Sequence, residues 1–142
     1  MTSKVPNANE QDLEVAIAAA EAAFAPGSKW ATMTASGRSR CLWKLSELVG
    51  EPEHAQAMAL LDANCFGRPV GETMKYDIPA ASEGLQYFAG WPGKLTGDTL
   101  PADDGFFKIV KHEPFGITAA IAAWNGPVSC IFLVFKLLQH GP

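Results

Sequence analysis

The sequence predicts an α/β fold in which helices come first and the first strands of a parallel sheet follow. Apolar residues recur at helical spacing along residues 9–91, turn residues gather after Trp91, and a short apolar run extends from Gly116 to Ala123. Such a run is typical of a strand covered on both faces, which needs neighbouring strands and long crossover connections. The 142 residues leave no room for them, so we expect one partial domain over residues 1–142 with an incomplete sheet.

The first expected helix begins after Asn9, a residue type that caps helices well. Leu13, Ile17 and Phe24 then recur at helical spacing, and the Pro26-Gly27 pair stops the helix. Acidic residues in the first turn favour the positive end of the helix dipole.

Two further helices are expected before residue 70, each with an apolar stripe. One begins after Ser36 and ends at Gly50, and the other covers Glu53 to Asn64 and ends at Gly67. The stripe comprises Cys41, Leu42, Leu45 and Leu48 in the former, and the latter carries Ala57, Met58, Leu60 and Leu61.

A fourth helix is expected to begin near Asp77, because proline is tolerated in a first helical turn and Pro79 follows. Its inward residues are Leu85, Phe88 and Ala89. Loops and strands are expected over residues 92–123, with one strand at Phe106 to Lys111, and a terminal helix over residues 127–138.

Composition excludes several classes of function. The net charge is −4, and no run of Lys or Arg marks a nucleic-acid partner. Asn125, Gly126 and Pro127 interrupt the apolar stretch from Ile117 to Leu138, so no membrane span is expected. Because the first thirty residues lack a signal or transit pattern, we expect a cytoplasmic protein. Charged residues make up 18% of the chain, below the usual value of about 25%, which indicates surface meant to be covered.

The cysteines and histidines do not form a metal site in the sequence. Cys41, Cys65 and Cys130 lack Cys-x-x-Cys spacing and are expected to be reduced, buried thiols. The three histidines have no ligand spacing, and Asp103-Asp104-Gly105 is better interpreted as a turn than as a calcium loop.

A series of short motifs, in order and at matching intervals, resembles the N-terminal part of the aldehyde dehydrogenase superfamily. No single motif is specific, but together they cover nearly the whole chain. They are Ala18-Ala19-Ala20 with Phe24, Trp30, Arg38 with Arg40, Gly67-Arg68-Pro69, Tyr87-Phe88-Ala89-Gly90-Trp91, Gly97 with Thr99 and Pro101, Glu113-Pro114-Phe115-Gly116, and Trp124-Asn125 with Pro127. The resemblance implies the N-terminal helices and first strands of a Rossmann-type domain.

The resemblance also implies an activity, the oxidation of a small aldehyde to a carboxylic acid with NAD or NADP. Asn125 matches the family's asparagine, whose amide donates a hydrogen bond to the oxygen of the thiohemiacetal. The backbone of Ile121, Ala122, Ala123 and Trp124 matches the strand end that lines the cofactor cleft. Phe106 to His112 resembles the family's oligomerisation strand, so a homo-oligomer, or pairing with a full-length relative, is expected.

Other parts of the family's machinery have no counterpart here. The nucleophilic cysteine, the activating glutamate and the glycine-containing cofactor loop lie farther along the family's chain, so the sequence resembles one truncated before the catalytic cysteine. Cys130 lies in an apolar stretch, a poor place for a thiolate. Local departures include Arg68 for the family's lysine and Gly126 for a bulky residue. We therefore expect an aldehyde dehydrogenase-like protein that is inactive as these 142 residues; the alternative is a non-catalytic remnant or interaction module.

Overall fold

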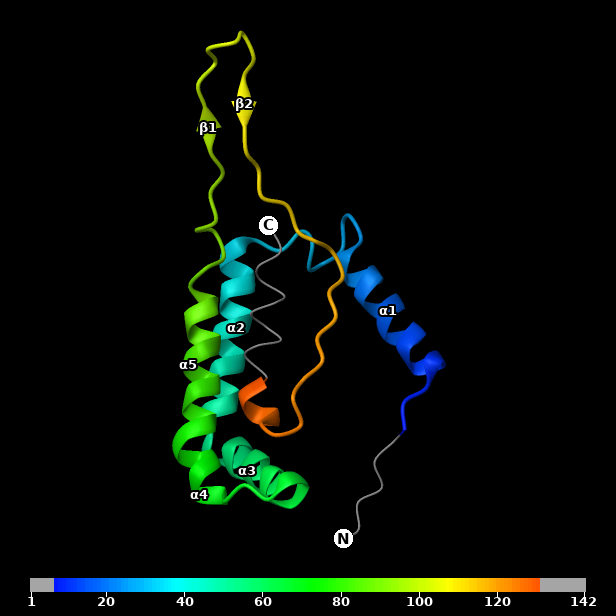
Figure 1. Cartoon of the computed structure of the whole chain (residues 1–142), viewed down its shortest axis with the longest axis vertical. Helices are drawn as coiled ribbons and strands as arrows, with labels where there is room; N and C mark the ends of the chain where they lie inside the picture. Colours follow the sequence, from blue (N-terminus) through cyan, green and yellow to red (C-terminus); the bar gives the residue numbers. More distant parts are fainter. Residues whose placement is uncertain (1–6, 131–142) are drawn as a thin grey trace. The chain divides into compact units, whose positions relative to one another are not determined.

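The computed structural model describes residues 7–130, which fall into two units divided after Met33 (Figure 1). The first unit contains α1, Glu10–Phe24. Asn9 caps this helix, because its Oδ1 accepts from the backbone N–H of Gln11 at 2.8 Å and of Asp12 at 3.2 Å. The expected cap and end of the first helix are therefore confirmed, although no residue of α1 is buried.

The second unit contains a helical bundle whose core lies between α2 and α5. These two helices lie side by side along their length (Figure 1). In chain order the bundle comprises α2 (Ala35–Gly50), α3 (Pro52–Phe66), α4 (Val70–Glu72), the π-helical segment η1 (Thr73–Asp77) and α5 (Ile78–Ala89). Its core residues are Leu42, Val49, Ala55, Ile78, Ala81, Leu85, Ala89 and Val128.

The fourth expected helix is the most accurate of the sequence predictions. Leu85, Phe88 and Ala89 are all buried, and Pro79 lies in the first turn of α5. The helical path starts earlier than expected, at Val70, because η1 joins α4 to α5 without a break. Gly67 closes α3 at φ +84°, the left-handed region that glycine adopts without a steric cost.

The apolar residues that predict α3 do not all face the bundle, although Met58 is partly buried against its core. Leu60 and Leu61 are 46% and 62% exposed, whereas Ala55 and Ala59 are buried. The small side chains at these positions let the helix approach its neighbours closely, while Leu60 and Leu61 point away from the bundle. In α2 the prediction is correct for Leu42 and wrong for Cys41 and Leu48, which are exposed.

After Trp91 the chain forms a narrow antiparallel hairpin, which we call the arm (residues 94–110; Figure 1). Its strands β1 (Thr99–Leu100) and β2 (Lys108–Ile109) pair Thr99 with Ile109. Two further backbone hydrogen bonds continue the pairing: the Asp98 N–H donates to the Val110 carbonyl at 3.2 Å, and the Val110 N–H donates to the Asp98 carbonyl at 2.8 Å. A strand within Phe106 to Lys111 is thus confirmed for its middle two residues.

The covered strand expected at Gly116 to Ala123 is not formed. The segment has no regular secondary structure, and Ile117 and Ile121 are 45% and 103% exposed. Among the described residues, the backbone N–H and C=O groups of residues 111–122 make no backbone hydrogen bond, because no neighbouring strand lies beside them. We call residues 111–122 the unpaired segment.

The chain turns helical again at Pro127, as expected, and remains so through Cys130. The rest of the predicted terminal helix, to residue 138, lies outside the described residues. Within residues 7–130, no helix is both long and apolar enough to cross a membrane.

Candidate active-site segment

The Asn125 turn comprises residues 123–126 and precedes the helix that begins at Pro127. Within it, the Gly126 N–H donates to the Ala123 carbonyl at 3.4 Å. The Cys130 N–H donates to the Gly126 carbonyl at 2.9 Å, which is the first helical hydrogen bond after the turn. The turn therefore links the unpaired segment to a helix start.

The Asn125 side chain is exposed and makes no hydrogen bond to another described residue. Trp124 beside it is 80% exposed, and the backbone of Ile121 and Ala122 is unpaired among the described residues. A free primary amide offers two N–H donors, the chemistry needed to receive negative charge on an oxygen. Exposed main-chain groups next to an aromatic side chain fit one wall of a dinucleotide site, since such sites combine apolar surface with a few polar groups.

Val128 and Ser129 attach the turn to the bundle, and Cys130 contacts the turn itself. Val128 is buried in the core, and Cys130 is 8% exposed with its Sγ 3.8 Å from the Ala123 carbonyl oxygen. Between them, the Ser129 hydroxyl donates to Asp77 Oδ1 at 3.0 Å. The sequence predicted the small buried role of Cys130 but not the other two contacts.

The second oxygen of Asp77 accepts from Arg68 Nε in an ion pair, and Asp62 lies in the same charged group. Asp62 is 4% exposed. Burial is the main cause that raises its pKa, and the negative charge of Asp77 adds to the effect, while Arg68 opposes it. In the sequence, Arg68 stands out only as a departure from a family motif. The opposite charges of Arg68 and Asp77, nine residues apart, are only a weak sign of their ion pair.

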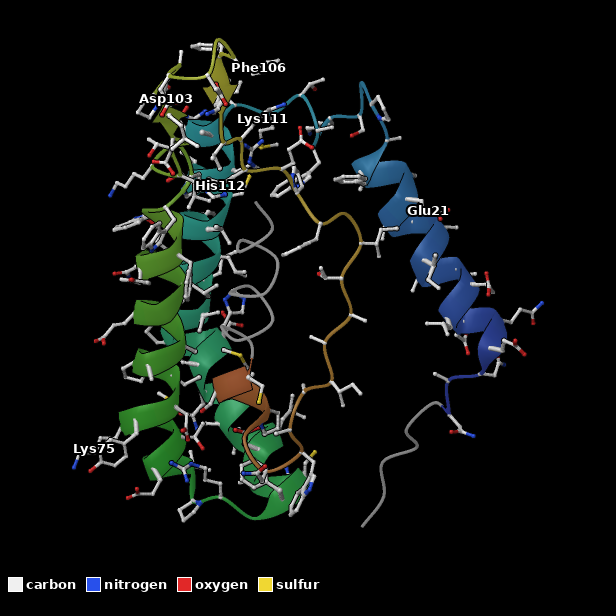
Figure 2. All side chains as sticks on the ribbon, turned by 45° about the horizontal axis from the view of Figure 1, so that its top comes forward. Glu21, Lys75, Asp103, Phe106, Lys111 and His112 are labelled. Atoms are coloured by element: carbon white, nitrogen blue, oxygen red, sulfur yellow. The ribbon has the colours of Figure 1, made fainter. Side chains whose placement is uncertain are left out.

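The other candidate groups have local structural partners. His54 Nδ1 lies 3.1 Å from the Leu48 carbonyl oxygen and 3.2 Å from a carboxylate oxygen of Glu51. Asp104 accepts from the Phe106 N–H at 3.2 Å and pairs with Lys108 at 2.7 Å, which lowers the pKa of Asp104. Asp103 and Phe106 lie at the turn of the arm, with Lys111 and His112 after its second strand (Figure 2).

All three cysteines are free thiols, but only Cys130 is buried. The expectation that Cys41 and Cys65 are buried is wrong, because each lies on the outward face of its helix. Within residues 7–130, no three His, Cys, Asp or Glu side chains come close enough to hold a metal ion.

The sequence matches known proteins over most of its length. The family model for the aldehyde dehydrogenase family matches residues 1–137. Over 134 residues the chain is 37% identical to retinaldehyde dehydrogenase 3 of Homo sapiens, covering 94% of this chain and 25% of that protein.

Solved structures agree with the sequence match. A mutant aldehyde dehydrogenase from Bacillus cereus has a TM-score of 0.85 and 33% identity, covering 94% of this chain and 27% of that one. An NAD⁺ complex of a Bacillus cereus aldehyde dehydrogenase has a TM-score of 0.69 and 36% identity over 75% of this chain and 21% of the other. The chain spans about a quarter of the length of these relatives, and its helix-rich fold matches their N-terminal part. It therefore belongs to the aldehyde dehydrogenase family.

Proposed function

We propose that this chain provides one wall of the active site of an NAD(P)-dependent aldehyde dehydrogenase, with Asn125 as its catalytic residue. The observation that carries the proposal is the exposed amide of Asn125, which makes no hydrogen bond to another described residue and lies in a turn whose following helix packs against the core. An oxyanion donor needs this combination, since it must be unpaired before the reaction and fixed in position.

The amide acts when a thiolate nucleophile attacks the aldehyde carbon. The carbonyl π electrons move to oxygen, and the Asn125 Nδ2–H donates to the oxyanion that forms. Loss of one such donor costs on the order of 100-fold to 1,000-fold in kcat. Asn125→Ala in the active enzyme is therefore expected to lower kcat by this factor.

The cofactor wall is formed by the backbone of residues 121–124. Exposed, unpaired N–H and C=O groups at Ile121 and Ala122 would hold NAD or NADP, with Trp124 as an apolar neighbour. When bound, the nicotinamide ring accepts the hydride. The likeness to an NAD⁺ complex from Bacillus cereus supports this assignment.

Residues 1–142 alone are expected to form no NADH from an aldehyde. Cys130 is buried in apolar surroundings, where a thiolate is disfavoured, and Cys41 and Cys65 lie on helices away from the Asn125 turn in sequence. Without a thiolate there is no oxyanion for Asn125 to stabilise.

A second candidate function is a non-catalytic remnant or interaction module that pairs with a full-length subunit. The unpaired backbone of residues 111–122 and the exposed apolar residues of the arm favour it. The same features support assembly as a homo-oligomer. Free thiols at positions 41, 65 and 130 support a location in the reducing cytoplasm.

One experiment separates the two candidates. The native protein is isolated from its own cells with an antibody against Pro92 to Asp104, and its intact mass and its aldehyde-dependent NADH formation are measured. A species several times heavier than 15.2 kDa that makes NADH supports the enzyme. A 15.2 kDa species that makes none supports the interaction module, and turnover by the 15.2 kDa chain would contradict both.

A further inference from the structure

The Asn125 turn depends on other parts of the chain for its position. Within it, the only backbone hydrogen bond among the described residues is the long 3.4 Å contact from Gly126 to Ala123. The unpaired segment before it offers no backbone hydrogen bond to a described residue. Among the described residues, the contacts that hold the Asn125 turn in place therefore come from the helix that follows it.

Within residues 127–130, Ser129 is the residue whose side chain makes a hydrogen bond to the bundle. Its hydroxyl donates to Asp77 Oδ1 at 3.0 Å, across 52 positions of sequence. Val128 beside it packs in the core, but apolar contacts are non-directional and leave the helix free to rotate slightly. A hydrogen bond has an angular preference, so it sets the rotation of the first helical turn.

Asp77 is well placed to receive this bond. Its side chain is 17% exposed, and its two oxygens serve different segments, Oδ1 for Ser129 and Oδ2 for Arg68. Arg68 comes after Gly67, the residue that caps α3, and Asp77 is the last residue of η1. One carboxylate thus ties three segments together, and charge-assisted hydrogen bonds are stronger than neutral ones.

We propose that Asp77 is a positioning residue for Asn125: it receives Ser129 on one oxygen and Arg68 on the other, and so fixes the helix start that follows the Asn125 turn. The inference deepens the proposed function, because positioning affects catalysis only if Asn125 is the oxyanion donor. The contacts of Asp77 with Ser129 and Arg68 lie within this chain and do not require a bound cofactor.

The first test is amide hydrogen exchange on the 142-residue chain. Ser129→Ala and Asp77→Ala are expected to speed exchange of the Cys130 N–H by about tenfold, because loss of one hydrogen bond to a charged group releases the helix start. Ser129→Thr keeps a hydroxyl and is expected to restore slow exchange. The matched control is Ser82→Ala, which removes a serine bond to the Ser46 carbonyl at 3.0 Å, between α5 and α2.

The control decides how a change is interpreted. Faster exchange at Cys130 in Ser129→Ala with no change in Ser82→Ala supports the positioning role. Unchanged exchange in Ser129→Ala, or equal acceleration in Ser82→Ala, would overturn it, since the latter means general loosening of the bundle.

A second test uses the native enzyme and separates the two proposals. If Asp77 positions Asn125, Ser129→Ala lowers kcat about tenfold while KM stays within about twofold. Loss of kcat in Asn125→Ala without loss in Ser129→Ala would overturn the positioning role alone. An unchanged kcat in Asn125→Ala would instead overturn the proposed function, whatever the exchange data show.

Discussion

The helical bundle and the unpaired segment are similar in their wealth of apolar residues but differ in how they satisfy their backbones. The backbone groups of α2 and α5 make their hydrogen bonds within each helix. Leu42 of α2 and Leu85 of α5 are buried in the core that the two helices share. Residues 111–122 form no regular secondary structure, and their backbone groups find no backbone partner among the described residues. The difference teaches that a helix completes its hydrogen bonds from local sequence, whereas a strand needs a neighbour from elsewhere.

The largest expected difference between these regions is in hydrogen exchange. Amides inside α2 and α5 are expected to exchange at least about a thousandfold more slowly than those at Ile117 to Ala123, because the latter have no backbone acceptor among the described residues. Mass spectrometry of deuterium uptake measures both regions at once. Slow exchange at Ile117 to Ala123 would mean that this segment finds a partner in solution.

Leu85 tests the bundle side of the comparison. Leu85→Ala is expected to lower the free energy of unfolding by about 2–5 kcal/mol, because the side chain is fully buried and its removal leaves a cavity. Ile121→Ala, at an exposed position, is the control and is expected to change stability by less than about 0.5 kcal/mol. Urea unfolding followed by circular dichroism measures both variants, and similar losses would erase the distinction between the two regions.

Gly97 tests the arm. A Cβ at this position would lie 1.9 Å from the Val110 carbonyl oxygen, so Gly97→Ala cannot be accommodated without moving one strand. We expect the Asp98 and Val110 amides to lose protection from exchange, while the urea midpoint of the bundle stays the same. Gly126→Ala is the control, because its nearest neighbour would be the Ser129 Cβ at 3.8 Å. Retained protection in Gly97→Ala would show that the strands are not paired as described.

The smallest expected effect is that of Asp62→Asn on the free energy of unfolding, and this effect depends on pH. The pKa of Asp62 is raised in the folded protein, so the folded state binds this proton more tightly than the unfolded state does. The stabilisation from this group is therefore present below its ordinary pKa of 3.8 and is lost as the pH rises through the raised value. Asp62→Asn removes the buried charge, so the variant gains stability relative to the wild type near neutral pH and little near pH 3.

The control for this prediction is Glu14→Gln on α1, an exposed carboxylate. It is expected to leave the difference between the two pH values unchanged. Chemical unfolding at both pH values measures the effect. A loss of stability in Asp62→Asn near neutral pH would mean that the carboxylate is held by favourable contacts that outweigh its burial.

Sequence reasoning succeeded where local rules decide the structure. The Asn9 cap, the Gly67 end and the inward face of α5 all follow from short-range chemistry. It failed for α3, where Leu60 and Leu61 face outward, because a helix with apolar residues on two faces does not reveal which face its neighbours cover. It also missed the Asp77–Ser129 contact, since no local pattern reports a hydrogen bond across 52 positions.

The unpaired segment has a consequence for the newly made chain. Residues 117–123, with the sequence ITAAIAA, contain no charge, no proline and no glycine, which are features of segments that pair with other strands when they stay exposed. The flanks oppose this tendency: Pro114 and the Lys111–Glu113 ion pair, at 3.0 Å, precede the stretch, and Pro127 follows it. Charges and prolines at the flanks of an apolar segment oppose its pairing with other chains, so we expect these residues to limit such pairing to residues 117–123.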